Sequence, residues 1–387
     1  MLVGFVLLPV SLVYAGLLLP ESEKEKWELR NRDRGADEQW LMTYYVGYQN
    51  GYLKPKDVDY SLMTHIVVGG VGVRPDGSLN EHWHLSNGDG REMAEDVGKR
   101  ADRANVKKLI WLGGPNEEEY FYEATKDETR ATLVANILEL VDELDYDGVD
   151  IDWEPIRAKD EVGILKLVQD LRAEDPDLLI TVPVNWVPSS ILYSKDLSLY
   201  RSLSKYADKI FIMSYSMAGP WPGWESWHGS ALAGDSATTP SSIKTSVYAY
   251  QRAGVPDEKL GIGIGTYATC WEYPVRDVEQ RLPSTFYPRD VHTMSMRTLK
   301  DDYYLRKYEE WDNTAKMPYL SFNRARGDLD CGFISYENER SIEEKVEYMK
   351  RKDLGGLIVW NIGTGYYPEK SRSNRHPLLE AAWEAFE

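Results

Sequence analysis

A cluster of acidic residues in the middle of the chain has a spacing suited to acid–base chemistry. Residues 147–154 read DGVDIDWE, and their β-branched and aromatic members predict a strand over residues 146–153. Because side chains alternate along a strand, Asp150, Asp152 and Glu154 project from the same face. Three carboxyl groups are therefore expected side by side.

Neighbouring acids on that face have Cα atoms roughly 6.6 Å apart. Like charges this close cannot all stay ionised at neutral pH, so at least one carboxyl retains a proton and can serve as a general acid. A calcium site is the structural alternative. Calcium loops place oxygen ligands on flexible, glycine-containing turns, whereas these acids lie among β-branched and aromatic residues. We therefore interpret the cluster as catalytic.

Strand and helix patterns alternate along most of the chain. Helical patterns include residues 90–105, 127–144 and 161–174. Eight β/α units predict an α/β fold closed as a (β/α)8 TIM barrel. The acidic stretch lies on the fourth strand, with Glu154 at its C-terminal end, where barrel enzymes carry their catalytic groups. The predicted strands lie near residues 42–48, 63–71, 107–113, 146–153, 178–184, 209–215, 259–266 and 355–361.

The chain divides into an N-terminal segment and one catalytic unit. Residues 1–20 are apolar and uncharged, and we expect a secretory signal peptide or a membrane anchor there. Residues 21–39 predict a charged linker, and residues 40–387 the barrel. The longest break in the alternation, about residues 271–325, predicts a short insertion between strands seven and eight. The catalytic part is expected to be extracellular, either secreted or anchored with this part outside.

The composition limits the classes of partner and cofactor that we expect for this chain. The 387 residues include 45 Lys and Arg against 63 Asp and Glu, a formal net charge of −18, which argues against nucleic acid as a partner. Cys270 and Cys331 offer no zinc spacing and could form one disulfide if the fold brings them together. The six histidines show no ligand pattern. We expect no metal site, no cofactor and no obligate protein partner, and hence a monomer.

Aromatic residues are abundant, with 13 Trp and 26 Tyr against 7 Phe. Trp and Tyr combine an apolar ring with a polar tip and stack well on sugar rings. Their excess over Phe indicates an aromatic-lined cleft rather than additional core.

The acidic stretch resembles the DxxDxDxE signature of the family 18 glycoside hydrolases, the chitinases and their relatives. Asp147, Asp150, Asp152 and Glu154 match it in full. The likeness covers nearly everything from residue 43 to the C-terminus.

Further segments resemble other strands of that family. YVGY at 45–48 and MTHI at 63–66 are similar to its first two strands, and GGLIVW at 355–360 to its last. WLGG at 111–114 lies where the family has SxGG, so Trp111 replaces the serine. We interpret Gly113 and Gly114 as structural.

The segment IFIMSYS at 210–216 resembles the sixth strand of the family, whose pattern is Met-x-Tyr-Asp. Met213 and Tyr215 match, whereas Ser216 stands in place of the aspartate. The likeness implies that the Tyr215 hydroxyl donates to an amide carbonyl oxygen of the substrate.

The resemblance implies substrate-assisted retaining hydrolysis of 2-acetamido sugars. Glu154 would protonate the glycosidic oxygen, and Asp152 would accept the acetamido N–H while the substrate's own carbonyl oxygen attacks the anomeric carbon. Asp150 would share a proton with Asp152. Trp360 would form the floor under the sugar at the cleavage point. The other residues that we expect to bind substrate are Met213, Tyr48 and Asp147.

Chitin or chito-oligosaccharide is therefore the expected substrate. Two alternatives remain open. An endo-β-N-acetylglucosaminidase acting on glycoprotein or peptidoglycan would use the same chemistry. A non-catalytic chitin-binding lectin on this fold would be expected to have lost Glu154, which is present.

Overall fold

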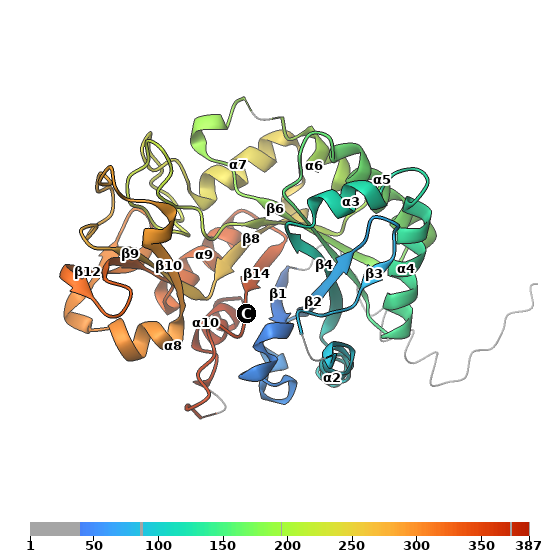
Figure 1. Ribbon diagram of the computed structural model, residues 1–387, viewed down its shortest axis with the longest axis horizontal. Coiled ribbons are helices and arrows are strands. Elements are labelled where there is room, and N and C mark those ends of the chain that lie inside the picture. The colour runs from blue at the N-terminus through green and yellow to red at the C-terminus, as the bar shows by residue number, and fades with distance from the viewer. Residues whose placement is uncertain (1–38, 86–87, 195, 372–373, 387) are drawn as a thin grey trace, which may run out of the picture. The chain divides into compact units, whose positions relative to one another are not determined.

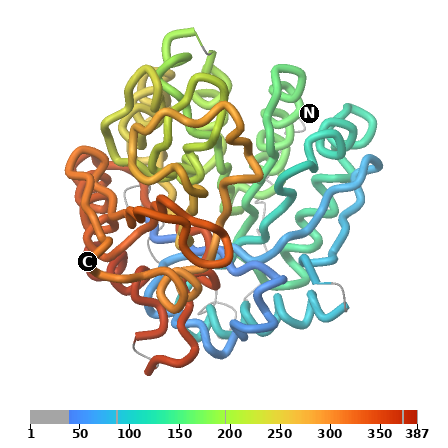
Figure 2. The backbone as a smooth tube through the Cα atoms, turned by 60° about the vertical axis from the view of Figure 1, so that its left-hand side comes forward, coloured from blue at the N-terminus to red at the C-terminus, as the bar shows by residue number. Residues whose placement is uncertain are grey.

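Eight parallel strands close into a barrel in the computed structural model, which describes residues 39–85, 88–194, 196–371 and 374–386. Their order around the barrel is β1-β2-β4-β5-β6-β7-β8-β14, and β14 pairs with β1 to close it. Figures 1 and 2 show the barrel within the unit formed by residues 39–387. The strands are β1 (Trp40–Val46), β2 (His65–Val73), β4 (Lys107–Pro115), β5 (Gly148–Glu154), β6 (Leu179–Asn185), β7 (Lys209–Met213), β8 (Leu260–Gly265) and β14 (Gly356–Trp360).

Helices follow most of these strands and pack on the outside of the barrel (Figure 1). They are α2 (Gly90–Arg103), α3 (Glu118–Ala124), α4 (Arg130–Glu143), α5 (Glu161–Glu174), α6 (Ser198–Leu203), α7 (Ile243–Ala253), α9 (Glu339–Arg351) and α10 (Pro377–Phe386). The short β3 (Leu79–Asn80) pairs antiparallel with the end of β2. The predicted TIM barrel is confirmed, and each predicted strand agrees with an observed one to within two residues at either end.

Two apolar layers hold the barrel together. The outer layer joins the outward faces of the strands to the helices; there Trp153 of β5 stacks on Phe121 of α3 with ring centroids 4.9 Å apart. The inner layer fills the barrel with side chains from several strands, as in other barrels of this kind. Its buried members are Trp40, Met42, Tyr44, Val46, Val67, Leu109, Trp111, Leu179, Phe211 and Ile358.

Strand register brings three interior positions to one level. Trp111 of β4 is the partner of Asp150 of β5, and Asp150 is in turn the partner of Thr181 of β6. Because parallel neighbours in register point their side chains the same way, these three side chains enter the barrel interior together. The acidic strand is thus flanked by an indole and a hydroxyl.

A second sheet lies between β8 and β14 and forms a lobe beside the barrel, at the left of Figure 1. Its antiparallel order is β10-β9-β13-β12-β11, and Cys270 of β9 is disulfide-bonded to Cys331 of β13. The strands are β9 (Tyr267–Glu272), β10 (Val291–Ser295), β11 (Glu309–Asp312), β12 (Met317–Arg326) and β13 (Cys331–Ser335), with the short α8 (Met296–Thr298) after β10. The sheet therefore extends beyond the predicted insertion, 271–325, at both ends.

Many tryptophans belong to the core, which corrects the interpretation of the aromatic surplus as cleft lining alone. Trp40 is buried inside the barrel and Trp83 and Trp153 in its outer layer, and Trp227 and Trp271 are buried in two smaller apolar clusters that include lobe residues. The predicted signal or anchor at 1–20 and most of the predicted linker lie outside the described residues. Within the described part of the chain, no helix has the length and apolar character needed to cross a membrane.

Candidate active site

Strand β5 points its three carboxyl groups into the C-terminal half of the barrel. Asp150 and Asp152 are 0% and 4% exposed, and Glu154 is partly exposed at the end of the strand. Burial of a carboxylate favours its protonated form unless donors compensate. The hydrogen bonds that each carboxyl receives therefore decide where the protons lie.

Asp150 is the deepest of the three and is held by two hydroxyl groups. Tyr44 of β1 donates to its Oδ2 over 2.7 Å, and Thr181 of β6 donates to its Oδ1. Burial raises the pKa of Asp150 to about 7; these two hydrogen bonds act against the rise and the charge of Glu154 adds to it. Both oxygens of Asp150 are thus occupied by donors.

Asp152 receives its hydrogen bond from an indole. Nε1 of Trp111 donates to Oδ2 over 2.9 Å, while the buried Oδ1 has no hydrogen-bond partner among the described residues. Burial, then the charges of Glu154 and Asp150, raise the pKa of Asp152 well above its ordinary value. Burial also raises the pKa of Glu154, and its interaction with Asp152 acts in the opposite direction. The pair retains a proton at pH values where isolated carboxyls are ionised.

A cleft of about 460 Å³ opens above these carboxyls at the C-terminal end of the barrel. Trp360, at the end of β14, lies nearly parallel to the Tyr215 ring, with centroids 6.4 Å apart and planes 17° apart. Such faces suit the apolar side of a pyranose. The residues that line the cleft are Tyr44, Tyr48, His84, Trp111, Pro115, Asp152, Glu154, Pro183, Met213, Tyr215 and Trp360.

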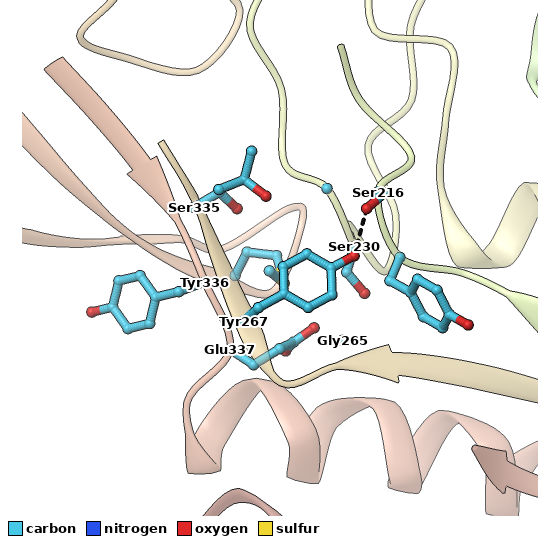
Figure 3. Close-up of a pocket in the computed structure, with 11 residues that line it drawn as sticks. Ser216, Ser230, Gly265, Tyr267, Ser335, Tyr336 and Glu337 are labelled. Atoms are coloured by element: carbon cyan, nitrogen blue, oxygen red, sulfur yellow. Dashed lines mark hydrogen bonds between the residues drawn. The ribbon is translucent and has the colours of Figure 1, made fainter. Parts of the chain in front are cut away.

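Ser216, which stands where the family pattern has aspartate, faces the lobe. Its hydroxyl is hydrogen-bonded to the phenol of Tyr267 at the start of β9, as Figure 3 shows. Both residues line a small cavity of about 20 Å³ beside Tyr215. That is space for about one water molecule. The replacement therefore converts a charged position into a neutral hydroxyl contact between barrel and lobe.

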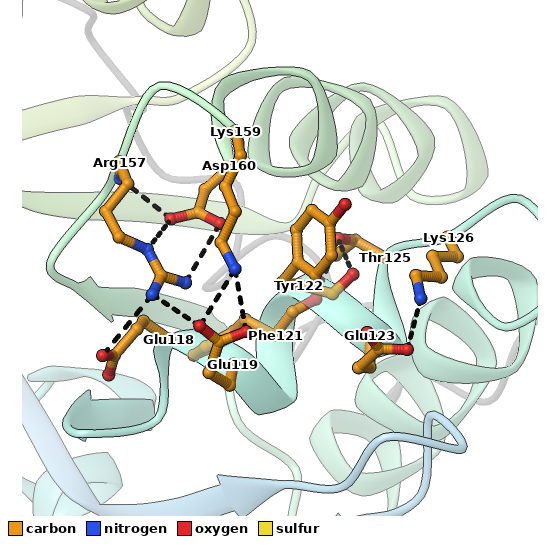
Figure 4. Close-up of polar contacts among 10 residues, drawn as sticks. All are labelled: Glu118, Glu119, Phe121, Tyr122, Glu123, Thr125, Lys126, Arg157, Lys159 and Asp160. Carbon is orange, nitrogen blue, oxygen red and sulfur yellow. Dashed lines mark hydrogen bonds and ion pairs between the residues drawn. The ribbon is translucent and has the colours of Figure 1, made fainter.

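The segment after Glu154 is fixed by ion pairs to α3 (Figure 4). Glu119 of α3 accepts from Arg157 over 2.7 Å and from Lys159 over 2.8 Å. Arg157 also pairs with the buried Asp160, at the beginning of α5. These contacts hold the loop between Glu154 and α5 against α3.

Asp147 was expected to bind substrate, and the structure contradicts this. It precedes β5, at the opposite end of the strand from Glu154, and the seven residue steps between them span roughly 23 Å. Its carboxylate pairs with Lys107 over 2.9 Å and accepts the amide N–H of Lys108 over 2.9 Å. Asp147 therefore fixes the entry of β5 against β4.

The other predicted residues lie together. Glu154, Asp152, Tyr215, Met213, Tyr48 and Trp360 line the cleft, and Asp150 lies beneath it. Tyr44, Thr181 and His84 were not predicted from the sequence, and Trp111 was predicted only as the replacement of a serine. Tyr44 belongs to the first predicted strand, two residues from Val46 on the same face, so strand alternation offered a signal for it.

His84 contributes a neutral ring to the cleft wall. The amide N–H of Gly70 donates to its Nδ1 over 3.2 Å, so the ring proton is carried on Nε2. Burial lowers the pKa of His84 to about 4, with the nearby His82 adding to the effect. Among the described residues, no group of three or more His, Cys, Asp or Glu side chains is placed to hold a metal ion.

Comparisons with known proteins agree with this architecture. The family model described as glycosyl hydrolases family 18 matches residues 41–365. A protein of Drosophila melanogaster named probable chitinase 2 is 25% identical over 82% of this chain and 69% of its own length. A chitinase-like effector of Moniliophthora perniciosa is 22% identical over 84% of this chain and 83% of its own. The crystal structure of the Group IV chitinase of Ostrinia furnacalis in complex with allosamidin has a TM-score of 0.75 at 25% identity, over 89% of this chain and 98% of that one.

Proposed function

Because this chain belongs to glycosyl hydrolase family 18, we propose that it is an active chitinase. It would hydrolyse β-1,4-linked N-acetylglucosamine chains, with the acetamido group of the substrate as nucleophile and retention at the anomeric carbon. The observation that carries the proposal is the position of Glu154. Its carboxyl lines the cleft at the end of β5, two residues after Asp152, whose buried Oδ1 lacks a partner among the described residues.

The reaction begins with proton transfer. Glu154 gives its proton to the glycosidic oxygen, and the acetamido carbonyl oxygen attacks the anomeric carbon as the bond to the leaving sugar breaks. The product is an oxazolinium ion, whose positive charge lies on a ring that carries the acetamido N–H. Asp152 accepts that N–H through Oδ1, which supplies a negative charge where positive charge develops.

The second half returns the enzyme to its starting state. Glu154, now ionised, takes a proton from a water molecule that attacks the anomeric carbon from the side the leaving sugar vacated. The bond from that carbon to the acetamido oxygen breaks as the water adds, and its electron pair restores the neutral acetamido group. Tyr215 orients the acetamido carbonyl oxygen by donating its hydroxyl hydrogen. Burial, followed by the charges of Tyr267 and the nearby carboxyls, raises the pKa of Tyr215 well above its ordinary value, so the phenol remains a donor.

Substrate binding is assigned to the aromatic walls. Trp360 offers its face to the sugar at the cleavage point, with Tyr48 and Met213 on the neighbouring walls. The formal charge of −18 is compatible with a neutral sugar polymer. The related Group IV chitinase of Ostrinia furnacalis, solved with allosamidin, supports a carbohydrate-sized ligand in this cleft.

We place the enzyme in an oxidising compartment, secreted or anchored with its catalytic unit outside the cell. The Cys270–Cys331 disulfide supports this location, since such bonds persist mainly outside the cytoplasm. We further propose that the enzyme acts as a monomer, because a single barrel carries all the proposed catalytic groups.

Hydrolysis of chitotetraose or chitopentaose, beside the matching de-N-acetylated oligomer, tests the proposal. Cleavage of only the acetylated substrate, with the β-anomer seen first by NMR, is the expected result. Glu154→Gln should lower kcat by roughly 10²–10⁴-fold while oligosaccharide binding persists. Asp152→Asn should also lower kcat by orders of magnitude.

Two results would redirect the assignment. Binding of chitotetraose without cleavage by the unmodified protein would identify a lectin. Cleavage confined to a glycoprotein or peptidoglycan would identify an endo-β-N-acetylglucosaminidase. Full activity in Glu154→Gln would remove Glu154 as the acid.

A further inference from the structure

Trp111 occupies a site that the surrounding backbone leaves open for an indole. It lies in the middle of β4 and is 3% exposed. A Cβ atom at Gly69 would lie 2.7 Å from the Cβ of Trp111, one at Gly70 would lie 3.2 Å from its ring, and one at Gly114 would lie 2.9 Å from its ring. A contact below 3.0 Å forces a shift, so glycine at 114 leaves room for the indole ring, whereas the contact at Gly69 is with Cβ and would arise with any side chain at 111. The family pattern SxGG has a much smaller residue here.

Three neighbouring rings fix the plane of that indole. His84, Trp360 and Tyr44 meet it edge to face at centroid distances of 4.8, 5.3 and 6.2 Å. A ring packed in this way cannot rotate without displacing its neighbours. Its Nε1–H is therefore aimed permanently at Oδ2 of Asp152, 2.9 Å away.

The donor type matters because an indole N–H can donate and cannot accept. A serine hydroxyl can rotate and do either. Oδ2 of Asp152 must therefore remain an acceptor, so any proton held by Asp152 is carried on Oδ1. The two oxygens of Asp150 are hydrogen-bonded to Tyr44 and Thr181, and among the described residues no hydrogen bond joins Asp150 to Asp152.

We propose that Trp111 is a positioning residue that holds Asp152 as a fixed acceptor and favours the form in which the shared proton lies on Glu154. This inference rests on the proposed function. By stabilising the negative charge on Asp152, the indole makes the acid available for the glycosidic oxygen and leaves Oδ1 for the acetamido N–H. The serine of the family pattern could not enforce this orientation.

The groups that face Asp152 come from several elements. Asp150 and Glu154 are on β5, and their charges raise the pKa of Asp152, whereas the Trp111 hydrogen bond lowers it. The phenols of Tyr44 on β1 and Tyr215 after β7 also interact with Asp152 and remain neutral, since burial raises their pKa values well above the ordinary one. His84 is neutral above a pKa of about 4. Removing the indole N–H should therefore move the titration of the Asp152–Glu154 pair to higher pH.

Trp111→Phe tests the proposal, with Trp153→Phe as the matched control. Trp153 is equally buried, lies on the outer face of β5, and its Nε1 has no partner among the described residues. Trp111→Phe should lower kcat roughly ten- to hundredfold, the effect of losing a hydrogen bond to a charged group, with KM changed less than about threefold. Its bell-shaped pH profile should move to higher pH. Trp153→Phe should keep the kcat and pH profile of the unmodified enzyme.

A second readout does not depend on catalysis. In protein labelled with ¹⁵N-tryptophan, the indole resonance lost in Trp111→Phe identifies Nε1 of Trp111. Its shift should follow pH through the titration of the carboxyl pair in the unmodified protein, and should be independent of pH in Asp152→Asn. A protein that cleaves no oligosaccharide but shows this titration would overturn the proposed function and leave the contact established.

Two results would overturn the inference itself. The first is a Trp111→Phe enzyme with the kcat and pH profile of the control. The second is an indole resonance that is insensitive to pH in the unmodified protein. Either outcome leaves the proposed hydrolysis intact if the unmodified enzyme cleaves chitotetraose.

Discussion

The hydroxyl of Tyr44 on β1 donates to Oδ2 of Asp150 on β5 over 2.7 Å, across the interior of the barrel and 106 residues apart in sequence. The bond stabilises the ionised form of a carboxyl whose pKa burial raises to about 7. Removing this hydrogen bond should therefore lower the stability of the protein more at alkaline than at acidic pH.

Tyr44→Phe should destabilise the protein by about 1–1.5 kcal/mol more at pH 9 than at pH 5, because the bond lost at pH 9 is to an ionised carboxyl and the bond lost at pH 5 is to a neutral one. Urea unfolding at the two pH values measures this. Tyr45→Phe is the control. The hydroxyl of Tyr45, the next residue in the chain, donates to the carbonyl of Leu53 over 2.6 Å, so the loss of stability should be the same at both pH values. Equal losses for Tyr44→Phe at pH 5 and pH 9 would contradict the assignment.

Asp150→Asn should become more stabilising as pH rises. The pKa of Asp150 is raised in the folded state from 3.8 to about 7, so the folded protein binds the extra proton between these values. In the unmodified protein, the contribution of Asp150 to stability is complete below pH 3.8 and is lost as pH rises through 7. At pH 8 the variant should exceed the unmodified protein by up to about 4 kcal/mol, with little difference near pH 4. A melting-temperature difference that does not change with pH would oppose this account.

Trp360→Ala should weaken chitotetraose binding about tenfold, since it removes the flat face beneath the sugar. Trp360→Phe keeps an aromatic face and should lose much less. Calorimetric titration in the Glu154→Gln background measures binding without turnover. Equal affinities for the Ala and Phe variants would assign Trp360 to barrel packing instead.

Replacing both Cys270 and Cys331 with Ser should lower the free energy of unfolding by about 2–4 kcal/mol, the usual value for a disulfide closing a long loop. The bond joins two strands of the lobe, and none of the barrel carboxyls contacts it. We therefore expect turnover of short oligomers at 25 °C to persist while the melting temperature falls. An unchanged melting temperature would show that the loop is constrained by the sheet alone.

Local patterns predicted the barrel and the acid. Alternation along β5 is a property of consecutive residues, so three carboxyls on one face follow from the sequence alone. Asp147 was misassigned from the DxxDxDxE likeness, since it is out of phase with the three acids and lies at the end of the strand opposite Glu154. The bonds from Trp111 and Tyr44 span 41 and 106 residues and depend on barrel closure and register, which no local pattern carries.

The lobe was underestimated for a related reason. Its antiparallel strands follow one another with the short α8 as the only α-helix within residues 267–335, so the strand and helix alternation that marks a barrel ceases there. Only Thr266 separates β8 from β9, so no loop or turn marks the point where the barrel strand ends. The predicted insertion therefore begins too late, at residue 271.

Thr266 is the single residue between barrel and lobe at that end, and its hydroxyl is bonded to Thr364 over 2.9 Å and to the carbonyl of Asn361. The lobe is thus joined to the barrel at this point by a short, hydrogen-bonded connection and not by a flexible linker. A chimera that imports a relative's lobe would have to preserve the β8–Thr266–β9 continuity, or the transplant would shift a barrel strand by a residue and turn its side chains to the opposite face.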